Sequence, residues 1–365
     1  MIEWKDVTLV IAAGGKSSRM GTDKRHLMWQ GVPLLRHLLE QADRFRFAAV
    51  FLAADRITNE FRTLAARYRL KILVDTRPDQ GPIEALRGGL EHARTSWILF
   101  ISCDQPFLQF SALQPLLTAA SERPKYKAVI PEAGGYRQML AGLYHRDLLP
   151  GIVQGQIRDK RRLGAVIPTE CIQLVPFEGS RMFFNVNTPA DWRLAKGRLI
   201  NRQRQIPFVT ISAPVSNTGK TTFIERLIPE LEQAGLRIGV VKSDCHGYDI
   251  DKPGKDSWRF REAGASAVAV VSPSGYFIEQ KTPQRAELVE VARKITGVDV
   301  ILIESRSHGA APFISLWRDK GELDINDETA AVFTSEGADE NSEIRTFALD
   351  DIPTAVELIL FLTGR

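Results

Sequence analysis

The sequence lacks a long hydrophobic run, a cysteine pattern and a secretory leader. No apolar run among its 365 residues approaches the roughly 20 needed to cross a bilayer, so no membrane partner is expected. Its three cysteines are scattered without CxxC spacing, which indicates neither a disulfide framework nor a zinc site. The N-terminal stretch MIEWKDVTLVIAAGG has no basic head and no cleavage site of a signal peptide. We therefore expect a cytoplasmic protein.

The charge is unevenly divided along the chain. The 48 Lys and Arg nearly balance the 44 Asp and Glu, for a net charge of +4. Residues 1–206 hold 31 basic and 19 acidic residues (+12), whereas residues 207–365 hold 17 and 25 (−8). The basic residues of the first half form no stripe interleaved with aromatics, so no nucleic-acid partner is expected. Small phosphorylated substrates explain the charge as well.

The chain length and composition, with 44% hydrophobic and 25% charged residues, indicate two globular domains. Short apolar runs alternate with helical patterns in both halves, which predicts an α/β fold. We place a first domain at 1–198, a polar linker at 199–206 and a second domain at 207–365. Strands are expected at Val7–Ile11, Ala48–Leu52, Lys71–Val74, Trp97–Ile101, Phe208–Ser212 and Val298–Ile303, and residues 330–334 and a helix from Asp351 to Leu362 are expected to close the second domain.

The stretch VTLVIAAGGKSSRMGTDK predicts a strand that leads into a phosphate-binding loop. After the β-branched run come small residues that let a ligand approach the backbone: Ala12, Ala13, Gly14 and Gly15. Basic side chains follow within reach of one loop: Lys16, Arg19 and Lys24. This combination indicates a triphosphate site, and a strand-to-helix turn with solvated lysines is the alternative.

Four further polar residues of the first half are candidates for the same site. Asp75 follows a strand, where it could accept hydrogen bonds from a base or ribose, or act only as a capping or solvated aspartate. Asp104 follows the strand 97–101 and is the candidate ligand for a Mg²⁺ ion that bridges phosphate oxygens. In FFNVNTPADW, Asn185 and Asn187 are expected to end a strand. Their side chains are expected to face a second substrate or the water shell of the metal ion, and a capping turn is the alternative.

The second half carries a near match to a nucleotide-binding P-loop. The string APVSNTGKTT follows a predicted strand and fits G-x-x-x-x-G-K-[ST], except that Pro214 occupies the first glycine position. Its candidate phosphate-binding and magnesium-binding residues are Gly219, Lys220, Thr221 and Thr222. Glu304, after the strand 298–303, holds the place of the second acidic group that binds magnesium through water.

Two strings resemble known families. AAGGKSSRMGTDK resembles the signature LAGG-x-x-x-RMG-x-DK of the molybdenum cofactor guanylyltransferases, with Ala12 in place of the usual leucine. RIGVVKSDCHGYDIDKPGKDSWRFREAGA resembles the MobB-type GTP-binding adaptor of molybdenum cofactor synthesis, which shares a DxDKPGKDS core. Where that family continues VEGFK, this chain reads IESRS, a difference that bears on hydrolysis more than on binding.

The resemblance implies a natural fusion of two three-layer domains, a GT-A/Rossmann-like nucleotidyltransferase and a P-loop NTPase-like domain. The implied reaction transfers GMP from Mg-GTP to molybdopterin with release of pyrophosphate. Lys24, Arg19 and Asp104 would be catalytic, and Asp75 would contact the base. Molybdenum insertion proteins and apo-molybdoenzymes are possible partners. The alternatives are a cytidylyltransferase, or a GTP-dependent cofactor carrier whose first domain is inactive.

Overall fold

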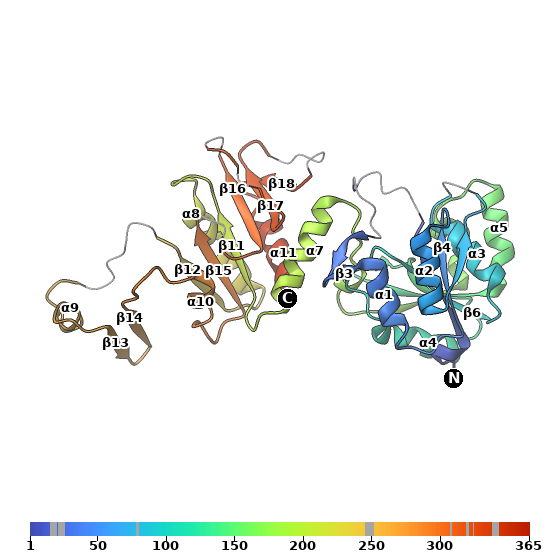
Figure 1. Ribbon diagram of the computed structural model, residues 1–365, viewed down its shortest axis with the longest axis horizontal. Coiled ribbons are helices and arrows are strands. Elements are labelled where there is room, and N and C mark those ends of the chain that lie inside the picture. The colour runs from blue at the N-terminus through green and yellow to red at the C-terminus, as the bar shows by residue number, and fades with distance from the viewer. Residues whose placement is uncertain are drawn as a thin grey trace. The chain divides into compact units, whose positions relative to one another are not determined.

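The chain forms two compact units, Met1–Asp191 and Trp192–Arg365. The computed structural model describes residues 1–14, 20, 26–77, 80–244, 252–306, 309–318, 321–323, 325–337 and 343–365. Both units contain a β-sheet flanked by helices (Figure 1). Within the described ranges, no helix is both long enough and apolar enough to span a membrane.

The first unit is built on a mixed sheet of the order β10-β7-β9-β6-β1-β4-β5, with β8 paired to β7. Only β9 on this path runs antiparallel to its neighbours. A short hairpin of Met28–Trp29 (β2) and Val32–Pro33 (β3) stands apart from it. The strands of the sheet are β1 Val7–Ala12, β4 Ala49–Ala54, β5 Lys71–Val74, β6 Trp97–Ser102, β7 Ala128–Ala133, β8 Tyr136–Arg137, β9 Ala141–His145 and β10 Ile172–Pro176.

Helices cover both faces of this sheet because its strands bury side chains on both faces. On one face, β1 contributes Leu9 and Ile11 to a core with α1 (Leu34–Ala42), α2 (Asn59–Tyr68) and α4 (Gln114–Glu122). On the other, Val10 packs with α3 (Pro82–His92), α5 (Leu149–Ile157) and α6 (Leu163–Val166). The alternation of Leu9, Val10 and Ile11 follows from the two-residue period of a strand.

The second unit has an all-parallel sheet of the order β12-β15-β11-β16-β17-β18. A separate antiparallel pair, β13 (Ala267–Ser272) and β14 (Gly275–Gln280), follows the short helix α9 (Asp256–Glu262). The strands of the sheet are β11 Phe208–Ser212, β12 Ile238–Lys242, β15 Val300–Ser305, β16 Phe313–Trp317, β17 Thr329–Thr334 and β18 Arg345–Ala348.

The helices of the second unit are α8 (Lys220–Gln233), α10 (Leu288–Ala292) and α11 (Ile352–Thr363), together with most of α7 (Pro189–Arg202). Helices α8 and α11 pack against each other, and α10 packs on a core formed with β11, β12 and β15. Helix α7 is tied to α11 by Arg198, which donates to the carbonyl of Phe361 at 2.6 Å, and by Asn201, which donates to that of Leu362 at 3.1 Å.

The predicted α/β class with two sheet-containing units is confirmed. The boundaries of several elements differ from the prediction: β15 begins at Val300 and runs through Glu304, so that residue lies within the strand. Part of the segment predicted as a linker, residues 199–202, is helical and belongs to α7, because Asn201 is 3% exposed and bonded to the second unit. Helix α11 begins at Ile352, and Asp351 is its N-cap.

Candidate functional site

In the first unit, the carboxyl ends of four neighbouring strands bring the candidate residues together. Strand β1 lies between β6 and β4. Strands β4 and β5 lie on one side of β1, and the next strand along the chain, β6, lies on its other side. Such a switch point is where open α/β sheets bind ligands. Beyond the strand ends, Ala13 donates to the carbonyl of Ala53 at 2.8 Å, and Cys103 donates to that of Ala12 at 3.0 Å. These backbone bonds hold the start of the predicted phosphate loop beside Asp104.

Gly14 lies directly against Asp75. A Cβ atom at Gly14 would come within 3.1 Å of Asp75 Oδ2 and 3.4 Å of the Asp55 nitrogen. Asp75 is itself fixed by its backbone N–H, which donates to the carbonyl of Ala54 at 2.9 Å. A side chain at position 14 would therefore press against the Asp75 carboxylate and require it to shift. The predicted neighbours Ala12, Ala13, Gly14 and Asp75 share one edge of the sheet.

The segment with the two asparagines lies beside Asp104, although it is not a strand. The N–H of Val186, between Asn185 and Asn187, donates to the carbonyl of Asp104 at 2.8 Å. The expectation that the asparagines end a strand is wrong, since residues 184–188 follow a short 3₁₀ helix, η6 (Arg181–Phe183), and have no sheet partner among the described residues. The N–H groups of Asn187 and Thr188 donate instead to the Asp191 side chain, at 2.9 and 3.0 Å. The predicted helix start is confirmed: Thr188 Oγ1 accepts from the N–H of Asp191 at 3.1 Å.

Two amide oxygens in this region are buried without a hydrogen-bond partner in the part of the chain that the structure describes. They are Oδ1 of Asn185 and Oε1 of Gln105, which follows Asp104. Buried polar atoms are normally satisfied, so an unsatisfied oxygen points to a missing donor or cation. The carboxylate of Asp104 and these amide oxygens are the hard oxygen donors that suit Mg²⁺. The residues present thus fit the ion that the sequence predicts.

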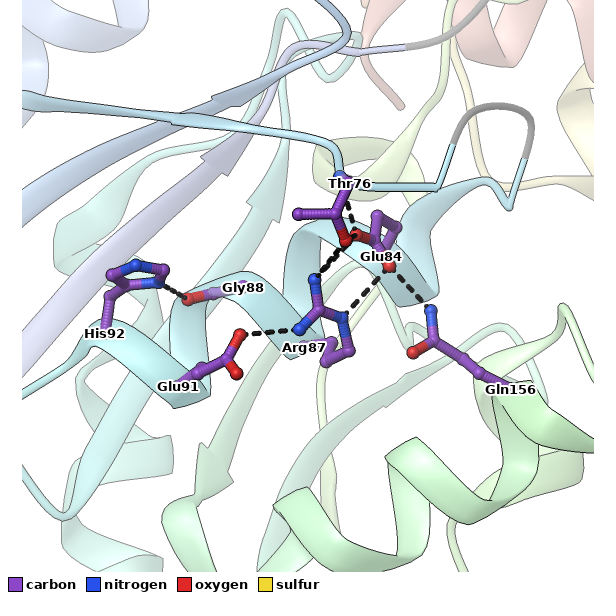
Figure 2. A network of polar contacts seen from close by, with 7 residues as sticks. All are labelled: Thr76, Glu84, Arg87, Gly88, Glu91, His92 and Gln156. Atoms are coloured by element: carbon purple, nitrogen blue, oxygen red, sulfur yellow. Dashed lines mark hydrogen bonds and ion pairs between the residues drawn. The ribbon is translucent and has the colours of Figure 1, made fainter.

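A network of polar contacts surrounds Thr76, the residue that follows Asp75 (Figure 2). Glu84, in the first turn of α3, has a side chain only 1% exposed. Its Oε1 accepts from the Thr76 N–H at 2.9 Å, from Thr76 Oγ1 at 2.7 Å and from Arg87 Nη2 at 2.7 Å. Its Oε2 accepts from Arg87 Nε at 3.1 Å and from Gln156 Nε2 on α5 at 2.8 Å. The carboxylate therefore ties the residue after Asp75 to two helices.

The pKa values of the neighbouring carboxyl groups of Glu84 and Asp75 are shifted in opposite directions. Burial would raise the pKa of Glu84, but its hydrogen bonds from Arg87, Gln156 and Thr76 lower that pKa to about 2. Burial, followed by the negative charges of Glu84 and Asp55, raises the pKa of Asp75 to about 6, with Arg87 opposing. Asp75 thus changes its charge near neutral pH while Glu84 stays ionised.

In the second unit, the P-loop residues line a cavity of about 520 Å³. Gly219 has φ +99°, a backbone conformation that favours glycine, and Lys220 begins α8 directly after it. Helix α8 follows the central strand β11, so its N-terminal N–H groups lie at the carboxyl edge of the sheet. The lining residues are Ser216, Asn217, Gly219, Lys220, Thr221, Thr222, Lys242, Ser243, Asp244, Glu304 and Arg306.

The two predicted magnesium ligands of this unit are in contact. Thr221 Oγ1 lies 3.0 Å from Oε1 and 3.1 Å from Oε2 of Glu304. A hydroxyl and a carboxylate held together beside a P-loop lysine fit a hydrated Mg²⁺. Burial lowers the pKa of Lys220, Glu304 opposes this, and Arg306 and Lys242 add to it. Among the residues described, no group of three or more His, Cys, Asp and Glu could hold a metal by itself, so phosphate oxygens would complete either site.

Some of the predicted residues lie outside the described ranges: Gly15, Arg19 and Lys24. Sequence reasoning missed Glu84, Arg87 and Gln156, whose contacts join segments up to 72 residues apart. It also missed Lys242 and Asp244, which reach the P-loop cavity from the end of β12. Lys242 is the last residue of β12 and Asp244 lies two residues beyond it, and this strand was not among those predicted from the sequence.

The first unit matches a known protein family. The family of MobA-like NTP transferase domains matches residues 9–170. A probable molybdenum cofactor guanylyltransferase of Deinococcus radiodurans is 37% identical over 201 residues, which cover 53% of this chain and 95% of that protein. The chain belongs to the molybdenum cofactor guanylyltransferase family. It is accordingly a nucleotidyltransferase, and the resemblance drawn from the glycine loop is confirmed.

The second unit of this nucleotidyltransferase matches a different family over residues 209–335, molybdopterin guanine dinucleotide synthesis protein B. The molybdopterin-guanine dinucleotide biosynthesis adapter protein of Haemophilus influenzae is 37% identical over 123 residues, 33% of this chain and 68% of that protein. Its Escherichia coli counterpart is 38% identical over 118 residues, 31% and 67%. The chain is a fusion of a guanylyltransferase-family domain and an adapter-family domain.

Proposed function

We propose that the first unit transfers GMP from GTP to the terminal phosphate of molybdopterin, and that the second unit binds GTP as an adapter. The observation that carries the proposal is the meeting of Gly14, Asp75, Asp104 and Asn185 at one switch point of the sheet. The functional division we propose is 1–198 for the transferase and 207–365 for the adapter, acting in the cytoplasm.

The reaction would proceed by positioning and charge neutralisation. An oxygen of the acceptor phosphate attacks the α-phosphorus of GTP, and the bond from that phosphorus to the pyrophosphate oxygen breaks. Ala12, Ala13 and Gly14 leave room for the triphosphate at the backbone, and Lys24 and Arg19 supply positive charge to it. The carboxylate of Asp75 accepts hydrogen bonds from the base. Asn185 and Asn187 orient the acceptor beside Asp104.

Asp104, with Asn185, would hold Mg²⁺ in the first unit, and Thr221 with Glu304 would hold it in the second. When bound, the ion neutralises negative charge on the phosphate oxygens. Lys220 pairs with the outer phosphates in the P-loop cavity. Molybdenum insertion proteins and apo-molybdoenzymes are the partners to which such a fusion would pass its product.

The test is pyrophosphate release by the full chain with Mg²⁺ and molybdopterin, with GTP, CTP and ATP compared in parallel. Turnover with GTP alone supports the proposal, and the Asp104→Ala variant should lose at least about a hundredfold in rate because the phosphate charge is no longer neutralised. Preference for CTP would identify a cytidylyltransferase. GTP binding without turnover would identify a carrier.

A further inference from the structure

The second unit contains another cavity, of about 480 Å³, at the edge of the sheet opposite the P-loop. It is lined by Phe208, the first residue of β11, by Arg237, which precedes β12, and by Ile301 near the start of β15. The P-loop cavity instead lies beyond the last residues of these strands. Strands of five or six residues span roughly 15–20 Å, so the two cavities are separate sites.

The floor of this cavity is apolar. Phe208, Ala292 and Ile301 are each no more than 3% exposed and belong to one core with α10. Ile206 and Val298 complete the apolar wall. A cavity of this volume with an apolar floor has the size and character of small-molecule sites in proteins.

Three arginines line the same cavity, and two of them lack an acidic partner. Arg237 is paired with Asp299, with Nε 3.1 Å from Oδ2. Arg204 stacks on the Phe208 ring, with its guanidinium carbon 3.6 Å from the ring centre. Its Nη1 donates to Asn201 Oδ1 at 2.7 Å and also to the carbonyl of Ala311, which leaves Nε and Nη2 for a ligand. Over the described ranges of the chain, neither Arg204 nor Arg293 forms an ion pair with a carboxylate.

Arg204 and Arg293 bring like charges to the lining of one cavity. Burial lowers the pKa of Arg204 to about 10, Glu328 opposes this from a distance, and the charge of Arg293 lowers it further. Two like charges over an apolar floor are stabilised when an anion lies between them. Guanidinium groups suit phosphate because their planar forks donate two parallel hydrogen bonds.

We propose that this arginine pocket, formed by Arg204, Arg293 and the apolar wall of Ile206 and Val298, binds a heterocyclic monophosphate. The flat ring lies against this partly exposed wall, and the phosphate accepts hydrogen bonds from the two guanidinium groups. The site is separate from the P-loop and does not depend on the proposed guanylyl transfer.

The test uses the full-length chain with flavin mononucleotide, a fused heterocycle that carries one phosphate and fluoresces. Saturable binding of one equivalent per chain is expected, with riboflavin, which has no phosphate, bound at least about tenfold more weakly. A smaller heterocyclic phosphate, 4-methylumbelliferyl phosphate, should compete. Excess Mg-GTP should not displace the flavin, because it occupies the P-loop.

Two matched variants locate the site. Arg293→Glu should weaken flavin mononucleotide binding at least about tenfold, because it places a carboxylate where the phosphate lies. Lys294→Glu makes the same charge change at the adjacent exposed residue, outside the lining, and should change binding by less than about threefold. Thermal melting of both variants verifies the fold. Failure of both phosphates to bind, displacement by GTP, or equal loss in the two variants would overturn the proposal.

Discussion

Replacing Glu84 by glutamine should shift the pH dependence of the enzyme through Asp75. Glu84 is one of the charges that hold the pKa of Asp75 near 6, and Arg87 acts in the opposite direction. The variant removes the negative charge and frees Arg87 from its strongest partner, so both changes favour ionised Asp75. The pKa of Asp75 should therefore fall, and burial, its largest cause, keeps the fall to about one unit or less.

The sign of the effect on catalysis follows from the charge that the proposed contact between Asp75 and the base requires. Only the ionised carboxylate accepts two hydrogen bonds from a guanine edge, so kcat/KM for GTP should decrease as the pH falls through 6 in the wild-type enzyme. In the Glu84→Gln variant, this fall in kcat/KM, the acid limb of the pH profile, should lie at lower pH. A purely structural role for Glu84 would lower kcat/KM at every pH without moving the limb.

The same substitution should reduce stability, because a buried carboxylate loses its charge. Lowering the pKa of Glu84 from 4.5 to about 2 corresponds to about 3 kcal/mol at 1.36 kcal/mol per unit. For a depressed pKa, this stabilisation is fully present above pH 4.5 and is lost as the pH falls through 2. Denaturant unfolding at pH 7 should show a loss of about 2–3 kcal/mol in the variant, since glutamine keeps an acceptor oxygen.

The assay is pyrophosphate release with GTP from pH 5 to pH 8, with Glu91→Gln as the matched control. Glu91 also bonds to Arg87, at 2.5 Å, but it is half exposed and is not bonded to Thr76. That control should leave the acid limb and the stability nearly unchanged. An unshifted limb in Glu84→Gln, or an equal shift in both variants, would refute this account of Asp75.

Three other substitutions test separate parts of the structure. Gly14→Ala places a Cβ 3.1 Å from Asp75 Oδ2, so KM for GTP should rise about tenfold in the turnover assay with little loss of stability. Lys220→Ala should weaken GTP binding to the second unit at least about tenfold by calorimetry, because the outer phosphates lose their cation. Gly89→Ala would bring a Cβ within 2.7 Å of Val10 Cγ2, and unfolding should show about 1–3 kcal/mol of destabilisation at unchanged KM.

Features that depend on neighbours along the chain could be predicted from the sequence. The apolar runs at β1, β6 and β11 predict buried strands because both of their faces are covered. Gly219 and Lys220 mark the start of a helix because the backbone conformation at this turn depends on adjacent residues alone. The polar residues after the strand ends indicate a site, since parallel strands bring their carboxyl ends to one edge.

Features that depend on distant segments were decided by the tertiary structure alone. Residues 184–188 look like a strand by composition, yet their backbone bonds to Asp104 and not to a sheet. Glu84 reads as an exposed helical residue, but helix α5 buries it with Gln156. Arg204 and Arg293 come together only when the core under α10 forms. The local sequence pattern determined the helices, the strands and the positions of the predicted phosphate loops. Long-range packing determined which polar side chains are buried beside those loops, and burial and neighbouring charges set the pKa values of these side chains.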